Sequence, residues 1–440
     1  MISQEMNDRL TRTGPDRACG QLLRRYWQPA ALSDELMGER PVCRSMVLGQ
    51  KLVLFRDEEG RLGALERHCA HRGADLSFGR REDGGLRCPF HGWLFDVSGR
   101  CLETPAEPDD RMCTKIRQRS YPVLERSGII FVYLGDGEPP HLPDLDCFVA
   151  PDTHVFAFKG HIDCNWLQAL EVGLDPAHAS FLHRFFDDAD TADSYGKQFR
   201  AASAGSDMPM TRVLREFPRP DIGVDATEFG LRITALRRID ERFTHVRVTN
   251  MLFPQAFVIP LSQEMTITQW HVPIDDYSCY WYAIFTGFRE KLDKTLMREQ
   301  RLELYQLPDY RPKVGRFNDY GFDPYEQAHQ TYTGMGADIN VHDQWAVESQ
   351  GAIQDRTQEH PGRTDRAINA HRRLLLSAMV ANEQGERPFM VLDRAEAAAI
   401  RGPHTVDGIG PSEGWQKFAR TVDSERVRGA PWFDESDRAP

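Results

Sequence analysis

Long hydrophobic runs are missing from this sequence. Among its 440 residues, the longest apolar stretches are residues 128–134 and 374–381, and Ser377 interrupts the second. A membrane-spanning helix needs about 20 consecutive apolar residues, so neither stretch is long enough to cross a bilayer. The N-terminus, MISQEMNDRL, is polar and lacks the apolar core of a signal peptide. We therefore expect a cytoplasmic protein without a membrane partner.

Basic residues and cysteines are also scarce. Lys and Arg number 54 against 66 Asp and Glu, which gives a net charge of −12. A protein this acidic has no general electrostatic attraction to nucleic acid, so we expect no nucleic-acid partner. Nine cysteines in 440 residues are too few for a disulfide scaffold, and a reducing compartment keeps them as thiols. Each cysteine is then expected to be a core residue or a metal ligand.

The chain is longer than one ordinary domain of roughly 100–200 residues. Residues 40–135 form short apolar runs between turns, and Gly49-Gln50 separates two such runs as in a hairpin. A Pro-rich stretch over 137–143 follows. Beyond it we expect helices over 165–183, 292–307 and 365–384 and after Asp393, and antiparallel strands over 229–259 and 265–288.

This pattern predicts an α+β protein of two domains. The first, over residues 23–140, is a small all-β domain. The second, over residues 141–440, is a larger α+β domain with an antiparallel sheet flanked by helices. Residues 1–22 are expected to pack on the larger domain.

Two Cys–His pairs lie on two turns of the small β domain. The first is Cys69-Ala-His71 and the second is Cys88-Pro-Phe-His91, with 16 residues between His71 and Cys88. Two thiolates and two imidazoles satisfy either a zinc ion or a [2Fe–2S] cluster with both cysteines on one iron and both histidines on the other. Zinc sites usually group Cys with Cys and His with His. The alternating order therefore favours the cluster.

At these residues the sequence resembles the Rieske domain of the oxygenase type. The cytochrome type carries a disulfide between its two cluster loops, and the matching positions here are Ala74 and Phe90. The cytochrome type also has a hydroxyl residue after His-Gly, where this chain has Trp93. Fewer hydrogen bonds to the sulfurs imply a low potential, which suits electron delivery to an iron–oxygen site. The resemblance implies one [2Fe–2S] cluster per chain, held by Cys69, His71, Cys88 and His91.

A second group of candidate ligands lies in the helical pattern after residue 165. Asp175 and His178 share a helix face, and His183 follows five residues later, roughly 140° around an ideal helix. Both histidines bind one metal only if the helix is kinked or ends between them, and Pro176 places a break just upstream. Two histidines and one distant carboxylate form the triad of non-haem Fe(II) oxygenases. Taken alone, the pattern fits a mononuclear iron site and fits equally well two ordinary polar histidines of a helix. The Rieske-like motif upstream favours the iron site.

This segment resembles the mononuclear-iron motif of Rieske oxygenase large subunits. The resemblance implies one Fe(II) per chain with His178 and His183 as ligands. It implies Asp175 as a catalytic bridge to a cluster histidine, His91 by analogy, of a neighbouring subunit. It also matches Asn165 to an asparagine near the iron, as a second catalytic residue.

The resemblance places the third iron ligand far downstream, at the start of a long C-terminal helix. Asp343 stands at the head of a helical pattern in that window, and Glu348 is the alternative ligand. His342, beside Asp343, is expected behind the ligands or at the surface. Glu171 matches an acidic position of the motif to which no role is assigned.

Residues 10–29 and 348–356 resemble the phthalate-dioxygenase branch of this family, and the resemblance covers roughly residues 8–400. It implies a separate flavin and [2Fe–2S] reductase as partner, O2 as co-substrate, and a homotrimer or two stacked trimers. Branch members act on aromatic acids, and Arg binds a carboxylate through two parallel hydrogen bonds. The expected substrate residues are Arg247, Arg238 and Ser180, with further candidates at Arg237, Arg200 and Arg212.

We therefore expect a terminal oxygenase component that cis-dihydroxylates an aromatic carboxylate such as phthalate, isophthalate or a substituted benzoate. A Rieske monooxygenase or O-demethylase uses the same machinery, and the motifs do not separate these outcomes. A Rieske electron carrier is a rival of another class. It needs only the four cluster ligands and leaves the two-histidine motif unexplained.

Overall fold

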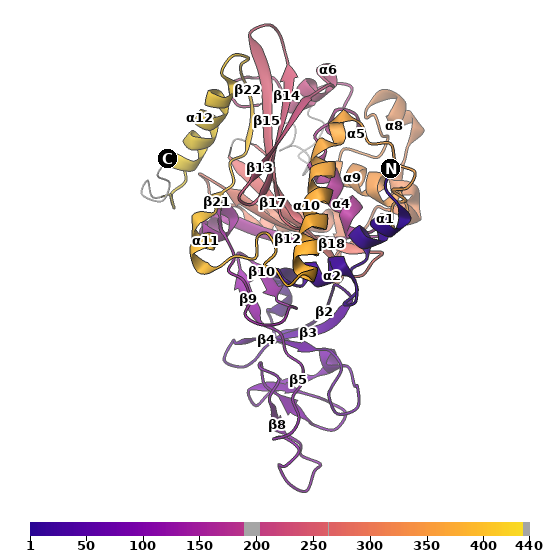
Figure 1. The fold of residues 1–440 in the computed structure, drawn as a ribbon, viewed down its shortest axis with the longest axis vertical. Helices are drawn as coiled ribbons and strands as arrows, with labels where there is room; N and C mark the ends of the chain where they lie inside the picture. The colour runs from indigo at the N-terminus through magenta and orange to yellow at the C-terminus, as the bar shows by residue number, and fades with distance from the viewer. Residues whose placement is uncertain (189–202, 263, 434–440) are drawn as a thin grey trace.

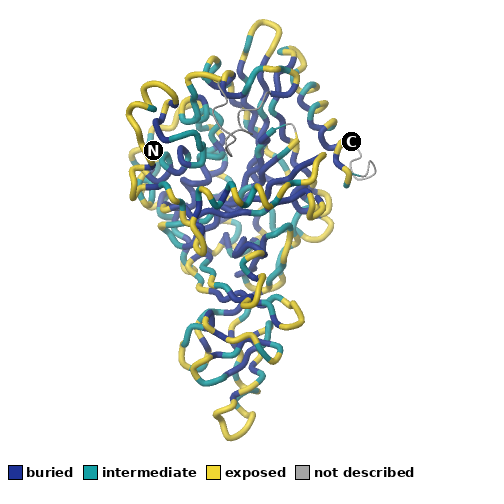
Figure 2. Tube along the Cα trace, turned by 180° about the vertical axis from the view of Figure 1, so that it is seen from behind, coloured by how far each residue is buried: buried dark blue, intermediate teal, exposed yellow. Residues whose placement is uncertain are grey.

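The computed structural model describes residues 1–188, 203–262 and 264–433. The molecule is elongated, with a small β-rich part and a larger α+β part at opposite ends of its long axis (Figure 1). Figure 2 shows buried segments through the centre of the larger part and exposed loops at the far end of the small part. Within the described ranges, no helix combines the length and the apolar character that a membrane crossing requires.

The small part contains three antiparallel sheets, with strand orders β1-β10-β9, β2-β3-β4 and β5-β6-β7-β8. The predicted hairpin at Gly49-Gln50 is confirmed, because β2 and β3 pair up to Val47↔Gln50. Leu48 and Gly49 make its turn with positive φ, as type I′ hairpin turns require. The strands are β1 (Gln28–Leu32), β2 (Val42–Val47), β3 (Gln50–Arg56), β4 (Leu62–Glu66), β5 (Arg80–Glu82), β6 (Gly85–Arg87), β7 (Leu94–Phe95), β8 (Cys101–Glu103), β9 (Val123–Arg126) and β10 (Ile129–Val132).

An eight-stranded antiparallel sheet forms the centre of the larger part. Its order is β12-β18-β17-β16-β15-β14-β13, and β22 also pairs with β15. The predicted strands over 229–259 and 265–288 are confirmed. The sheet consists of β12 (Val155–Ile162), β13 (Asp221–Thr227), β14 (Gly230–Arg238), β15 (Phe243–Leu252), β16 (Ala256–Pro260), β17 (Met265–Pro273), β18 (Cys279–Gly287) and β22 (Val406–Pro411). Two short pairs are β11 (Asp144–Leu145) with β21 (Arg401–Gly402), and β19 (Tyr305–Gln306) with β20 (Arg311–Pro312).

Helices flank this sheet, which confirms the predicted α+β class. The central helix α4 contacts β16, β17 and β18, while α10 contacts β13, β14 and α2. The N-terminal helix α1 lies against α4 and α10 (Figure 1). The helices are α1 (Gln4–Thr11), α2 (Ala18–Leu23), α3 (Asp146–Val149), α4 (Trp166–Leu174), α5 (Ala179–Leu182), α6 (Met210–Glu216), α7 (Lys294–Leu304), α8 (Pro324–His329), α9 (Ile339–Glu348), α10 (Arg366–Glu383), α11 (Arg394–Ala399) and α12 (Trp415–Arg428).

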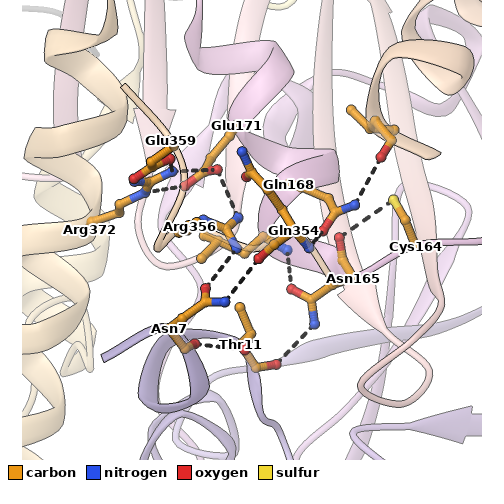
Figure 3. Close-up of polar contacts among 12 residues, drawn as sticks. Asn7, Thr11, Cys164, Asn165, Gln168, Glu171, Gln354, Arg356, Glu359 and Arg372 are labelled. Atoms are coloured by element: carbon orange, nitrogen blue, oxygen red, sulfur yellow. Dashed lines mark hydrogen bonds and ion pairs between the residues drawn. The ribbon is translucent and has the colours of Figure 1, made fainter. Parts of the chain in front are cut away.

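Glu171 on α4 is the centre of a buried ionic network (Figure 3). Its carboxylate accepts hydrogen bonds from Arg356 Nη2 at 2.9 Å and from Arg372 Nε at 2.6 Å. Burial raises the pKa of Glu171, but the two guanidinium groups outweigh burial and hold the pKa below its usual value. Arg372 also binds Glu359, and Arg356 Nη1 donates to Asn7 Oδ1 at 3.2 Å. One carboxylate therefore joins α4, α10, α1 and the segment after α9.

Replacing Glu171 by Gln keeps the side-chain volume and leaves Arg356 and Arg372 without their shared carboxylate. Removing one partner of a buried ion pair leaves the other charge uncompensated, so we expect the free energy of unfolding to fall by about 3–5 kcal/mol. Chemical denaturation followed by circular dichroism measures this loss.

Glu383→Gln is the matched control for this prediction. Glu383 lies on the same helix as Arg372 and pairs with Arg9 at 2.5 Å near the surface. Such a pair contributes about 0–1 kcal/mol, so this variant should unfold almost as the parent protein does. Equal losses in the two variants would contradict the role given to Glu171.

Candidate metal centres and active site

The two Cys–His pairs lie on loops of the same geometry. In each loop the cysteine N–H donates to the carbonyl five residues later, Ala74 or Trp93, at 2.8 Å. The N–H of Gly73 or Gly92 donates back to the cysteine carbonyl, at 2.8 and 2.9 Å. These glycines have φ of +76° and +75°, a conformation that glycine adopts without steric cost. The sequence therefore builds two equivalent turns, each presenting one thiol and one imidazole.

The four side chains of these loops converge. Cys69 and Cys88 are buried with their thiols in contact, and burial raises the pKa of Cys69 to about 11. The ring centroids of His71 and His91 lie 4.5 Å apart. His91 Nδ1 is buried and has no hydrogen-bond partner among the described residues. Paired buried thiols beside paired imidazoles form the donor set of a [2Fe–2S] cluster, so the residues fit this cofactor.

The helical segment predicted over 165–183 consists of two helices. α4 ends at Leu174, and Asp175-Pro176 separates it from α5, a single turn between His178 and His183. Proline lacks an N–H and its ring clashes with the preceding turn, so α4 cannot continue through it. The expected break upstream of His178 is thus confirmed. It brings the two imidazole centroids to 5.1 Å.

Asp343 on α9 completes a group of three candidate ligands. Its Oδ1 lies 3.7 Å from His178 Nε2 and 3.3 Å from His183 Nε2, and the ligand atoms of all three lie within 4.8 Å of one another. Burial lowers the pKa of His178. Burial raises the pKa of Asp343, but the two histidines outweigh it and hold the pKa below its usual value. Two imidazoles and one carboxylate fit a mononuclear Fe(II) centre.

The expectation that Asp343 begins its helix is wrong. Asp338 is the N-cap of α9, because its side chain accepts a hydrogen bond from Asn340 N at 2.9 Å, and Asp343 is the fifth helical residue. Glu348, the alternative ligand, is engaged elsewhere: it accepts from Asp163 N at 3.0 Å and from the Tyr320 hydroxyl at 2.8 Å. The geometry thus favours Asp343 over Glu348.

His342 fixes the position of the proton on His183. His342 Nε2 lies 2.9 Å from Gly336 O, and its Nδ1 lies 3.5 Å from His183 Nδ1. A carbonyl only accepts, so His342 Nε2 carries the hydrogen, and burial lowers the pKa of His342 to about 4. Its Nδ1 is then an acceptor for His183 Nδ1–H. His183 Nε2 therefore keeps its lone pair toward Asp343. Of the two expected positions, His342 takes the one behind the ligands.

Asp175 lies on the other side of His178. Its Oδ2 is 3.8 Å from His178 Nδ1, while His178 Nε2 faces Asp343. Asp175 Oδ1 accepts from Ala177 N at 2.8 Å, which holds the carboxylate at the break between α4 and α5. Asp175 and His178 border two cavities, one of about 190 Å³ beside Asp343 and one of about 310 Å³ toward Glu171.

Asn165 does not join the iron-ligand group. Its side chain is the N-cap of α4, accepting a hydrogen bond from Leu167 N at 3.1 Å. Its amide donates to the carbonyl of Thr11 at 3.0 Å (Figure 3) and to the carbonyl of Asp276 at 2.8 Å. These contacts give Asn165 a structural role in starting α4 and in holding the N-terminal segment, in place of the expected catalytic one.

The cavity of about 190 Å³ opens beside the three candidate ligands. A cavity of about 150 Å³ holds benzene, so this volume admits a substituted aromatic ring. Polar groups on its wall include His271 and Gln269 of β17. Most of the wall is apolar and includes Val172, Leu214, Phe257, Ile259, Ile267 and Trp281. Such a site suits a largely apolar ligand held by a few polar contacts.

Two arginines of the sheet line this cavity, Arg237 and Arg247. Side chains alternate along β14, so Arg237 is 1% exposed on the inner face while Arg238 is exposed. The expectation that Arg238 contacts substrate is therefore wrong. Ser180 is buried outside the cavity lining, and its Oγ accepts a hydrogen bond from Arg237 Nη2 at 3.2 Å. Ser180 thus orients an arginine, where we had expected it to touch substrate.

From the sequence, Arg237 is only a further candidate for contact with the substrate. The signal that selects it is the alternation Ile233, Ala235, Arg237, which puts this arginine on the buried face of the strand. Arg212, another candidate, pairs with Glu216 at 2.9 Å near the surface. Arg200 lies outside the described residues.

Asp343→Ala should remove the mononuclear iron and abolish turnover, because only two of three ligands remain. The visible absorbance of the [2Fe–2S] cluster should be unchanged, since its ligands lie on other loops. Metal analysis of the purified variant, beside its absorbance spectrum, measures both effects. Asp355→Asn changes an exposed acidic residue of the same downstream window and should retain its iron. Full activity in the Asp343 variant would contradict the assignment.

Comparison with known proteins agrees with these two centres. Residues 26–122 match the Rieske [2Fe-2S] domain and residues 132–426 match the LigXa C-terminal domain like family. The chain is 32% identical to the phthalate 4,5-dioxygenase oxygenase subunit of Pseudomonas putida, over 91% of each chain. It is 34% identical to the tert-butanol monooxygenase / tert-amyl alcohol desaturase oxygenase subunit of Aquincola tertiaricarbonis, over 85% of this chain and 76% of that one.

Solved structures with a similar fold include dicamba monooxygenase bound to dicamba. The TM-score is 0.56 at 21% identity, over 82% of this chain and 99% of that chain. The matched models together span most of the sequence, and the relatives above are similar over most of their length. The chain therefore belongs to the Rieske non-haem iron oxygenases, as an oxygenase subunit that carries a [2Fe–2S] cluster and a mononuclear iron.

Proposed function

We propose that this terminal oxygenase hydroxylates an aromatic monocarboxylate, such as a substituted benzoate, and that cis-dihydroxylation is its reaction. Arg237 is the observation that carries the proposal. A buried cation at the wall of an apolar cavity selects a ligand that is apolar in its body and anionic at one end. An aromatic acid has this chemistry.

Arg237 has free hydrogen-bonding capacity at this wall. Its Nη2 donates to Pro176 O at 2.9 Å and to Ser180 Oγ at 3.2 Å, both uncharged groups. Its Nε and Nη1 have no hydrogen-bond partner in the described part of the chain. Burial lowers the pKa of Arg237 to about 10, so the side chain is still charged at neutral pH. A substrate carboxylate would supply the missing counter-ion and accept from the two free nitrogens.

The charges around Arg237 favour a single carboxylate on the substrate. Arg247 Nη1 is paired with Asp407, and its Nη2 donates to Pro260 O at 3.2 Å. Burial raises the pKa of Asp407, but His245 and Arg247 outweigh burial and hold the carboxyl ionised. Burial lowers the pKa of His245, while the Asp407 carboxylate 3.2 Å from its Nε2 raises it. Among the described residues of this corner, Arg237 has no carboxylate within hydrogen-bond distance, although Asp407 and Asp175 raise its pKa from farther away. Arg247 is already paired, so a single substrate carboxylate matches the one guanidinium that still has free donors.

The residues around the iron site have separate roles in the proposed reaction. When bound, the cluster supplies single electrons and the iron activates O2. We propose that His178, His183 and Asp343 hold the iron, that the pair His342 and Gly336 keeps His183 in the required tautomer, and that Asp175 orients His178 from behind. Arg237 holds the ring by its carboxylate, and the apolar wall excludes water from the reacting face.

Electrons come from a separate reductase, which we propose to be a flavin and [2Fe–2S] protein. The cluster loops and α5 lie at opposite ends of the long axis (Figure 1). We therefore propose that the cluster of one subunit serves the iron of the next, with Asp175 facing the neighbour's His91 in a homotrimer or two stacked trimers. The second cavity, which borders Asp175 and His178, supports an approach from that side.

Arg237→Gln should weaken binding of the aromatic acid by roughly 10–100-fold, because a charge-assisted hydrogen bond contributes about 1.5–3 kcal/mol. Substrate titration of the reduced enzyme measures the change in Kd. Arg238→Gln is the matched control, since the next residue of β14 is exposed, and its Kd should equal that of the parent. An equal rise in Kd in both variants would indicate a long-range charge effect and would contradict direct binding of the carboxylate by Arg237.

The reaction itself is tested by one turnover of the reduced enzyme under 18O2 with a panel of substituted benzoates and phthalate isomers. Two labelled oxygens in one product establish a dioxygenase and identify its substrate. One labelled oxygen, or loss of a methyl group, establishes a monooxygenase or an O-demethylase. The similarity to a monooxygenase subunit makes this the alternative outcome. Turnover of dicarboxylates alone would contradict the single-charge argument.

A further inference from the structure

Two cysteines outside the cluster lie in contact at the far end of the small part. Cys101 Sγ is 3.6 Å from Cys113 Sγ, and the Thr104 hydroxyl lies 3.5 Å from Cys113 Sγ. Cys101 is buried on β8, whereas Cys113 is partly exposed. A disulfide needs the sulfurs at about 2.05 Å, so closing the bond moves them by about 1.5 Å. A side-chain rotation or a small shift of the loop provides such a movement.

The segment between these cysteines, which we call the tip segment (residues 104–112), packs against a cluster loop. A side-chain carbon at Gly92 would come within 2.7 Å of Pro105 Cγ. Arg87 ties the same region together, because its Nη1 lies 2.8 Å from Gly92 O and 2.8 Å from Glu103 Oε2. Residues 105–111 are otherwise exposed. The tip segment is thus fixed at its base and against Gly92, and its outer part faces solvent.

We propose that Cys101 and Cys113 form a reversible thiol–disulfide pair that fastens the tip segment over the cluster loop. The oxidant is hydrogen peroxide, the two-electron reduction product of O2. Peroxide first converts the more exposed Cys113 thiol to a sulfenic acid with loss of one water. The Cys101 sulfur then attacks Cys113 Sγ, and a second water leaves. Two thiols and one peroxide give one disulfide and two waters, and a dithiol reverses the step.

The chain offers a direct assay, because trypsin separates the two cysteines. Cleavage after Arg100, Arg111 and Lys115 yields the peptides 101–111 and 112–115, with one cysteine in each. The holoenzyme, with its cluster absorbance intact, is treated with a few equivalents of hydrogen peroxide. It is then denatured in iodoacetamide and digested without reductant. The expected product is the cross-linked pair of these peptides, which dithiothreitol converts to the two separate peptides.

Alkylation of both peptides at every peroxide dose would overturn the proposal, as would a cross-link of either cysteine to another partner. Because this experiment uses the unaltered chain, it does not depend on the folding of a variant. Cys43→Ser is the matched control, since Cys43 is also partly exposed, and it should leave the cross-link unchanged. Cys113→Ser should abolish it.

A second measurement tests the fastening of the tip segment. Chelator-driven loss of the cluster absorbance should be slower in the cross-linked protein than in the dithiol form, by roughly threefold or more, because closing the loop restricts its opening. The Cys113→Ser variant should lose its cluster at the dithiol rate with or without peroxide. Equal rates in the two forms of the parent protein would overturn the link between the disulfide and the cluster loop.

Discussion

The buried carboxylate of Glu171 holds together the parts of the chain that position the iron ligands. It lies one helical turn before Asp175, so it fixes the end of α4 from which His178 and His183 follow. Arg356, which it binds, follows α9 and therefore the segment that carries Asp343. Asp343 is far in sequence from the two histidines, and its distance from them is set by this contact and by the packing of α4 against α9.

Pro176 explains why α4 ends where it does. A continuous helix would place His183 roughly 140° around the axis from His178, and the proline break puts the two histidines at the ends of a separate turn. A break in a helix leaves backbone N–H groups without their helical acceptors. The Asp175 carboxylate accepts a hydrogen bond from one of them, the N–H of Ala177. The residue proposed to carry the contact between subunits thus also stabilises the break that creates the site.

Metal ligands that are close together in the sequence could be predicted well from it. The direction in which individual side chains point could be predicted less well. The cluster motif is readable because each ligand pair lies within one turn, so spacing alone places the donors. Asp343 was predicted from a resemblance, although its position within the helix was not. Arg237 and Arg238 are neighbours in sequence and face opposite sides of β14, and the alternation with Ile233 and Ala235 indicates which of them is buried. Asn165 is matched by resemblance to a family asparagine near the iron, and the match does not tell which groups its amide contacts; here these are the start of α4 and two backbone carbonyls.

A monooxygenase subunit and a dioxygenase subunit are similar to this chain to nearly the same degree, so overall similarity does not separate the two reactions, and we expect selectivity to arise in the wall of the cavity. Here the wall combines an apolar surface with one cation whose two free nitrogens need an acceptor. A small neutral alcohol leaves these nitrogens without an acceptor. The free-energy cost of burying unpaired donors then lowers the affinity for the alcohol. A carboxylate pairs them and fixes the ring at one end, which leaves the opposite end to face the iron ligands. On this argument, the distance from Arg237 to the iron decides which ring carbons are oxidised, and the iron ligands themselves do not.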